Sequence, residues 1–224
     1  MTPRYQLLIF DWDGTLMDSV ARIVSCMQHS ARDCLLPVPA DEAVRDIIGL
    51  SLQVAIPRLF PGLADVALEQ FIARYREHYL YLDPTPTPLF PGVAEQLSRW
   101  HADGYRLAVA TGKARAGLER VLDETGLGSL FVARRGADEA RSKPDPLMLQ
   151  QLLDELDVPS HQALMVGDSV HDMAMAQAIN MDRVGISWGV HSTLQLQQHE
   201  PCCVVDTIDQ LASFLTQQTT DSCY

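Results

Sequence analysis

Two aspartates, Asp11 and Asp13, directly follow a short apolar run, QLLIF at residues 6–10. A carboxylate at the end of a buried strand is costly unless a cation, a metal ion or a hydrogen-bond donor pairs with it. Paired carboxylates in such a place can serve as metal ligands, nucleophiles, acids or bases. A third aspartate, Asp18, is expected to start a helix and to play no part in catalysis.

Further polar residues follow other apolar runs. Thr111 and Gly112 come after RLAVA, Lys143 lies in the segment RSKPDP, and Asp168 and Asp172 lie in GDSVHD. In open α/β sheets, ligands bind at the carboxyl ends of the strands. Four separate segments of the chain are therefore expected to bring carboxylates, a hydroxyl and an ammonium group to one edge of a sheet.

The elements that would hold these residues alternate between strand and helix. Short apolar runs predict buried strands, and amphipathic segments between them predict helices. The predicted strands are 6–10, 106–111, 131–135, 163–168, 183–188 and 202–206. This alternation predicts an α/β fold with a Rossmann-like, three-layer core built on a parallel sheet.

The first strand is separated from the others by a helical segment. Residues 17–83 carry helical patterns and no obvious strand, and a Pro-rich stretch, DPTPTPLFPG at 83–92, follows them. Pro-rich segments are extended and stiff, which suits a domain junction. We expect a core domain of residues 1–16 and 84–224, with a helical cap domain of residues 17–83 inserted after the first strand.

Composition limits the function classes. The formal net charge is −12 and there is no long basic run, so nucleic acid is not an expected partner. No stretch has the roughly 18 apolar residues of a membrane helix and no secretory signal is evident, so a cytoplasmic location without membrane contact is expected. The five cysteines show no metal-binding spacing and are expected to be incidental thiols.

The motifs together resemble the haloacid dehalogenase superfamily, and within it the phosphatases with a small helical cap. The resemblance rests on DWDGT at 11–15, Thr111 in VATGK, SKPDP around Lys143, and GDSVHDM at 167–173. It covers nearly the whole chain, including the position of the helical insert. The aspartate at position 13 favours phosphoryl chemistry over dehalogenation.

This resemblance implies catalytic roles for four residues. Asp11 would be the nucleophile that forms an aspartyl-phosphate. Asp13 would be the acid for the leaving oxygen and then the base for the attacking water. Thr111 and Lys143, with Gly112 beside them, would bind the phosphate oxygens, on which charge is stabilised in the transition state.

The resemblance also implies Mg²⁺ as the cofactor, which suits an all-oxygen site of carboxylates, phosphate and water. Asp11 and Asp168 would bind the metal through their side chains, and Asp13 through its backbone carbonyl. Asp172 would order the metal's waters or Lys143.

Substrate choice is expected to lie in the cap. The segment IIGLSLQ, residues 47–53, is similar to a cap loop that faces the active site in this family. Gly49, Ser51 and Gln53 are therefore candidates for substrate contact, and an equally good interpretation is that they only shape a helix–helix turn.

The function expected from these residues is Mg²⁺-dependent hydrolysis of small phosphate monoesters, of the phosphoglycolate or sugar phosphate type. A phosphomutase of the β-phosphoglucomutase type would use the same core and is the main alternative. A catalytically idle binding protein is a weaker one, because Asp11, Asp13, Thr111, Lys143 and Asp168 are all present. The oligomeric state, monomer or homodimer, is left open.

Overall fold

A computed structural model describes residues 2–220 and shows the predicted parallel sheet. Its six strands lie in the order β4-β3-β2-β5-β6-β7, and every neighbouring pair is parallel. The strands are β2 (Leu7–Phe10), β3 (Arg106–Ala110), β4 (Phe131–Arg135), β5 (Ala163–Gly167), β6 (Asp182–Ile186) and β7 (Cys203–Val205). The six predicted strands are confirmed, and β2 lies in the middle of the sheet.

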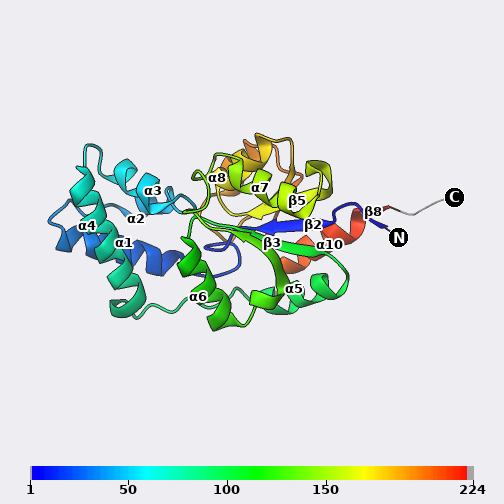
Figure 1. Cartoon of the computed structure of the whole chain (residues 1–224), viewed down its shortest axis with the longest axis horizontal. Coiled ribbons are helices and arrows are strands. Elements are labelled where there is room, and N and C mark those ends of the chain that lie inside the picture. Colours follow the sequence, from blue (N-terminus) through cyan, green and yellow to red (C-terminus); the bar gives the residue numbers. More distant parts are fainter. Residues whose placement is uncertain (1, 221–224) are drawn as a thin grey trace.

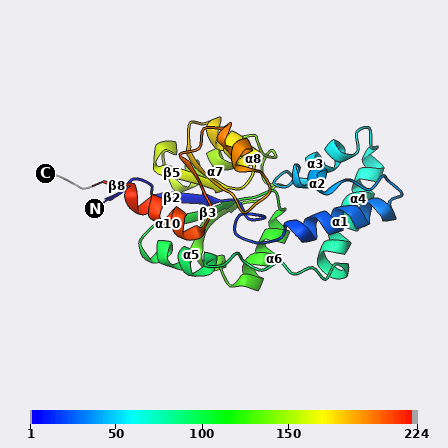
Figure 2. The same ribbon diagram turned by 180° about the vertical axis from the view of Figure 1, so that it is seen from behind.

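Helices cover both faces of the sheet, which gives three layers (Figures 1 and 2). One face carries α5 (Val93–Ala102), α6 (Arg115–Thr125) and α10 (Ile208–Gln217), and the other carries α7 (Leu147–Leu156) and α8 (Val170–Gln177). Three shorter helices, α9 (Thr193–Gln197), η2 (Gly128–Leu130) and η3 (Ser160–Gln162), connect the strands.

The alternation of side chains along β2 explains why its whole sequence is apolar. Leu8 and Phe10 pack with Trp100 of α5 on one face, whereas Leu7 and Ile9 belong to the cluster on the other face. All four β2 residues are fully buried, as expected for a strand covered on both sides. Asp11 therefore directly follows a strand that is packed on both faces.

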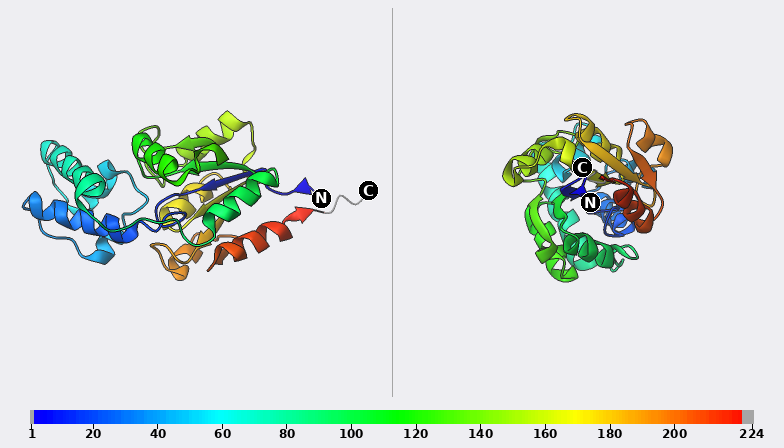
Figure 3. Two further views of the ribbon diagram at one scale, coloured as in Figure 1. Left: turned by 90° about the horizontal axis from the view of Figure 1, so that it is seen from below. Right: turned by 90° about the vertical axis from the view of Figure 1, so that its right-hand side faces the viewer.

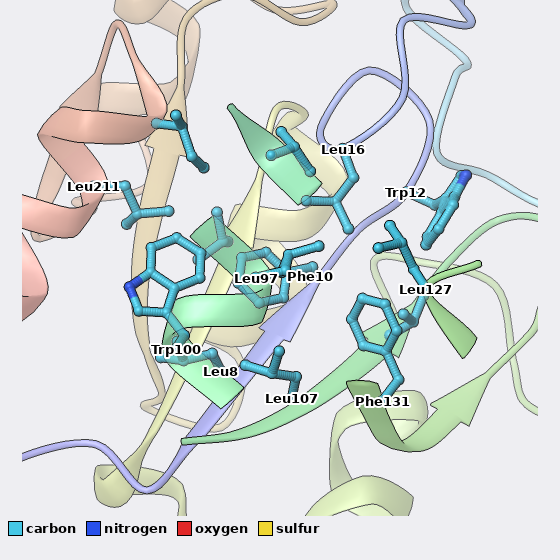
Figure 4. Packing of buried hydrophobic residues seen from close by; sticks show 14 of the residues in the cluster. Leu8, Phe10, Trp12, Leu16, Leu97, Trp100, Leu107, Leu127, Phe131 and Leu211 are labelled. Carbon is cyan, nitrogen blue, oxygen red and sulfur yellow. The ribbon is translucent and has the colours of Figure 1, made fainter. Parts of the chain in front are cut away.

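Trp12 also belongs to this core. Its ring is fully buried and meets Phe131 edge-on at 6.1 Å (Figure 4), and its Nε1 lies 3.4 Å from Sδ of Met17. The side chain between the two site aspartates therefore points away from them and fixes the chain on which they lie.

The inserted segment forms a helical group of its own at one end of the molecule (Figure 3). It contains α1 (Val20–Asp33), α2 (Asp41–Arg45), α3 (Leu52–Leu59), α4 (Asp65–Glu77) and the π-helical turn η1 (His78–Leu82). These elements share a separate hydrophobic cluster that includes Met27, Ile56 and Phe71. This separate core supports the proposed division into cap and core domains.

The two chain segments that join cap and core run beside each other. The Asp18 amide donates to the Pro88 carbonyl at 2.8 Å, and the Phe90 amide donates to the Leu16 carbonyl at 3.0 Å. The entering and leaving segments are thus hydrogen-bonded to each other where the cap joins the core.

At the end of the core away from the cap, β1 (Thr2–Pro3) pairs with β8 (Thr219–Thr220). Within residues 2–220, no helix combines the length and the apolar composition needed to cross a membrane. Cys26, Cys34, Cys202 and Cys203 are free thiols, and Cys223 lies outside the described residues.

Candidate active site

The carboxyl ends of the central strands bring the predicted site residues together. The Asp11 amide continues the β2 ladder by donating to the Val166 carbonyl at 3.0 Å. The Thr111 amide donates to the Arg135 carbonyl at 3.0 Å at the end of β3. These backbone bonds fix where both side chains leave the sheet, so their placement follows from strand register.

Lys143 is buried between two carboxylates. Its Nζ donates to Oδ1 of Asp11 at 2.7 Å and to Oδ1 of Asp172 at 2.6 Å, and the lysine side chain is fully inaccessible. Burial lowers the lysine pKa, but the two carboxylates outweigh burial, so the pKa of Lys143 is raised and its ammonium stays charged. The expected contact between Asp172 and Lys143 is present.

Three carboxylates, those of Asp11, Asp168 and Asp172, form a buried cluster whose oxygen atoms lie within 4.8 Å of one another. Thr15 Oγ1 donates to Asp168 Oδ1 at 2.8 Å, and the Val190 amide donates to Asp168 Oδ2 at 2.9 Å. The third carboxylate, that of Asp172, is positioned by the helix on which it lies, α8.

That helix, α8, begins with a capping box. Ser169 accepts from the Asp172 amide, and the Asp172 carboxylate accepts from the Ser169 amide at 3.2 Å and from its hydroxyl at 2.7 Å. Such a box satisfies the free amides at a helix start. It uses Oδ2 of Asp172, so Oδ1 is directed to Lys143.

The carboxylate cluster holds more negative charge than Lys143 can balance. Burial raises the pKa of Asp11 well above its ordinary value; Lys143 opposes the shift, while Asp172 and Asp168 add to it. Burial, with Asp172 nearby, raises the pKa of Asp168 to about 7, against hydrogen bonds from Thr15 and Val190. A divalent cation would relieve this repulsion.

One oxygen atom in this cluster lacks a partner. Oδ2 of Asp11 is buried and makes no hydrogen bond, which is costly for a carboxylate. A hard cation such as Mg²⁺ takes oxygen ligands of this kind. The residues present therefore fit the expected metal, and Asp11 and Asp168 would be its side-chain ligands.

Asp13 faces away from this cluster toward the cap. Ser19 Oγ donates to its Oδ1 at 2.5 Å, and Nζ of Lys113 lies 2.9 Å from the same oxygen. Lys113 also donates to the Tyr79 hydroxyl at 3.1 Å, and its Nζ lies 4.7 Å from the centre of the Tyr79 ring. Asp13 is thus linked to a cap residue through one lysine.

Gly14 lets the chain pass tightly beside the carboxylate of Asp168. Its φ of +80° is a left-handed value, and a Cβ at this position would overlap Oδ2 of Asp168. Glycine is the residue that tolerates both conditions. The Gly14 backbone therefore lies against the carboxylate cluster.

A cavity of about 470 Å³ opens between cap and core beside Asp13. Gly49 and Gln53 of the cap and Gly112 of the core, three of the candidates for substrate contact, line it. Ser51 is not among the lining residues; it is buried, and its amide donates to Ser142 Oγ at 2.9 Å. Ser51 therefore contacts the residue next to Lys143 and does not face the cavity.

Sequence patterns did not reveal three of the contacts. Lys113 and Ser19 both stand near the start of a predicted helix, which favours a helix-start role for each. In the structure Lys113 pairs with Asp13, and Ser19 makes no side-chain cap and donates to Asp13. Thr15 lies in the turn after the first strand, and its hydroxyl donates to Asp168. One sequence feature does indicate the contact between Asp13 and Lys113. DWDGT follows β2 and VATGK follows β3, and these two strands are neighbours in the sheet.

Comparison with known proteins agrees with this geometry. A sequence model of haloacid dehalogenase-like hydrolases matches residues 8–186. The chain belongs to this family. The match includes all the catalytic and metal-binding candidates, from Asp11 to Asp172, and the helical insert. The predicted family is confirmed.

Relatives of this hydrolase are named as phosphatases. It is 37% identical to "Probable phosphatase IndB" of Dickeya dadantii, over 92% of this chain and 91% of that protein. It is 29% identical to a "Phosphoglycolate phosphatase" of Colwellia psychrerythraea, over 92% and 95% of the two chains. The crystal structure of a "predicted phosphoglycolate phosphatase" from Haemophilus somnus is 26% identical in sequence and has a TM-score of 0.86. The match covers 96% of this chain and 99% of that chain. These names agree with the predicted enzyme class and do not favour the phosphomutase alternative.

Proposed function

We propose that this hydrolase is a Mg²⁺-dependent phosphatase that cleaves small phosphate monoesters through an aspartyl-phosphate on Asp11. Phosphoglycolate, named for several relatives, and sugar phosphates are the first substrates to assay. The observation that carries the proposal is the buried, unpartnered Oδ2 of Asp11, two residues from an aspartate that lines a cavity.

In the first step, the carboxylate of Asp11 attacks phosphorus and the bond from phosphorus to the leaving oxygen breaks. Lys143 donates to Oδ1 of Asp11 at 2.7 Å, which fixes the orientation of the carboxylate. Lys143 and Thr111 would then bind the phosphoryl oxygens, whose negative charge must be stabilised. A carboxylate is a weak nucleophile, and Mg²⁺ held by Asp11 and Asp168 would reduce its repulsion from the phosphate dianion.

Asp13 would move the protons in both steps. Its contacts with Ser19 and Lys113 both use Oδ1, which leaves Oδ2 to give a proton to the leaving oxygen. In the second step the same carboxylate would take a proton from the water that attacks the aspartyl-phosphate, and Asp11 and inorganic phosphate are released.

The test is hydrolysis of p-nitrophenyl phosphate by the purified protein with Mg²⁺ and with excess EDTA. We expect activity only with Mg²⁺, and a loss on the order of 10³-fold or more in Asp11→Ala. Asp18→Ala is the matched control, because Asp18 is exposed in the same stretch, and it should keep full activity. Full activity in Asp11→Ala would disprove the nucleophile assignment.

Two further measurements separate the finer alternatives. Intact-protein mass spectrometry of a quenched reaction should show one added phosphoryl group on the wild type and none on Asp11→Ala. Hexose 1-phosphates should yield inorganic phosphate; an isomerised sugar phosphate instead would indicate a mutase.

A further inference from the structure

The cavity beside Asp13 indicates what kind of substrate the cap accepts. Resting on the proposed function, we infer that the leaving group is an apolar body larger than the two-carbon acid of phosphoglycolate. It would occupy the 470 Å³ cavity between cap and core.

The position of the cavity assigns it to the leaving group and not to the phosphoryl group. Asp13 lines the cavity, whereas Asp11, Lys143 and Asp168 lie behind it in the buried cluster and are not among the lining residues. The residue that would protonate the leaving oxygen therefore faces the cavity, and the residue that would attack phosphorus does not. What is bonded to the leaving oxygen must then extend into this space.

The cap walls of the cavity are largely aliphatic. They come from α1, from the turn before α3, from the start of α3 and from η1, and they include Ile23, Met27, Ile48, Leu50, Leu52 and Leu80. The volume lies within the roughly 300–1,000 Å³ of sites that enclose drug-sized ligands. A two-carbon acid would leave most of this apolar surface in contact with water.

The cations at the cavity are poorly placed to receive a carboxylate. Lys113 is held by Asp13 and Tyr79. Arg120 donates to Glu124 at 2.6 Å, and its guanidinium lies 5.8 Å from the centre of the Tyr79 ring. Arg76 is exposed to solvent. Among these cations only Arg120 has a buried N–H without a partner, its Nε, so a carboxylate would find one free donor at most without displacing an ion pair, whereas an alkyl or aryl group needs none.

The test compares n-alkyl monophosphates, whose leaving groups have nearly the same basicity. We expect kcat/KM to rise about fourfold for each added methylene that becomes buried, or about 15-fold from ethyl to n-butyl phosphate. Phosphoglycolate should be a poorer substrate than n-butyl phosphate. Leu52→Ala and Leu80→Ala should each reduce the butyl-to-ethyl ratio; both side chains are partly exposed, so the fold should tolerate the change.

Leu194→Ala is the matched control, because Leu194 is 76% exposed on α9 and does not line the cavity. It should keep the wild-type ratio. A ratio near one in the wild type, or a preference for phosphoglycolate over n-butyl phosphate, would overturn the inference, while hydrolysis of the esters would leave the proposed function intact.

If no ester is hydrolysed, binding measurements can still test the apolar cavity site separately from the proposed phosphatase function. Calorimetry with ethyl- and n-butylphosphonate, which have no cleavable ester bond, should show about 15-fold tighter binding of the longer compound. Tighter binding without hydrolysis of any ester would disprove the proposed function and support the apolar cavity site. Equal binding of the two phosphonates would contradict the inference directly.

Discussion

Nζ of Lys113 lies 2.9 Å from Oδ1 of Asp13, and the two side chains are only 11% and 10% exposed. Lys113 precedes α6 in the core, and its second partner, Tyr79, belongs to the cap. Lys113 therefore connects Asp13, the proposed acid–base residue, with Tyr79 of the cap. We interpret Lys113 as a positioning residue for Asp13.

The first prediction concerns this ion pair. Lys113→Met should lower the free energy of unfolding by about 3 kcal/mol, because it leaves a nearly buried carboxylate without its cation. It should also lower kcat about 10- to 100-fold, since Asp13 then keeps only Ser19 to orient it. Urea unfolding and p-nitrophenyl phosphate kinetics measure the two effects.

The control is an exposed ion pair. Arg141 pairs with Asp145 at 2.6 Å, but its side chain is 70% exposed, so Arg141→Met should cost less than about 1 kcal/mol and leave kcat unchanged. Equal effects of the two substitutions would show that Lys113 has no special role.

The second prediction concerns Gly14. Gly14→Ala should lower stability and weaken Mg²⁺ binding at least tenfold, because the new Cβ would displace Asp168. Gly62→Ala has the same backbone strain, with φ +83°, but nothing within 4 Å of its Cβ. It should cost only the roughly 1–2 kcal/mol of a left-handed alanine and keep Mg²⁺ affinity. Thermal unfolding with and without Mg²⁺ compares them; equal Mg²⁺ affinity in both variants would contradict the expected clash.

The sequence allowed the fold and the main site to be predicted because both depend on strand ends. Continuous apolar runs such as residues 6–10 mark strands buried on both faces, and parallel strands bring their carboxyl ends to one edge. Asp11, Lys143 and Asp168 gather there for that reason. Their roles in catalysis remain predictions.

The contacts of Lys113, Ser19 and Ser51 could not be predicted in the same way. Each depends on how a cap segment lies against the core: Lys113 on Tyr79, Ser19 on the turn into the cap, and Ser51 on Ser142. Hydrophobic periodicity gives the secondary structure of such segments but not their tertiary partners. The aliphatic cavity also arises only when cap and core are brought together.

The third prediction concerns pH and the metal. The pKa of Asp168 is raised from 3.8 to about 7 in the folded, metal-free protein, mainly by burial. A raised carboxyl pKa favours folding below pH 3.8, and this contribution is lost as pH rises through about 7. Without metal, stability should therefore fall by on the order of a few kcal/mol between pH 5 and 8.

Mg²⁺ should reverse this trend, because it binds the ionised carboxylate. The increase in Tm caused by Mg²⁺ should be small at pH 5 and should grow until about pH 7 to 8. Asp168→Asn should abolish both the metal effect and much of the pH slope, and Asp123→Asn, an exposed aspartate on α6, should change neither. An Mg²⁺ effect that is the same at pH 5 and pH 8 would contradict the argument.

The fourth prediction concerns the approach of cap to core at Gly112. A Cβ on Gly112 would lie 2.5 Å from the Gly49 carbonyl oxygen and 2.7 Å from that of Leu50, and both obstacles are cap backbone. Gly112→Ala should therefore hold the cap loop away from the core. Because closure excludes water and completes the site, kcat/KM should fall at least tenfold.

Gly112 has no left-handed φ, and the three atoms nearest to its added Cβ all belong to the cap backbone. The unfolding midpoint of the core should therefore change by less than in Gly14→Ala. Gly128→Ala meets only an ordinary contact, 3.8 Å from Leu122 Cβ, and should keep wild-type kinetics. Small-angle X-ray scattering and limited proteolysis of residues 83–92 should show a more open cap in Gly112→Ala only. Wild-type activity in that variant would mean that the close approach of residues 49 and 50 to Gly112 is not needed for turnover.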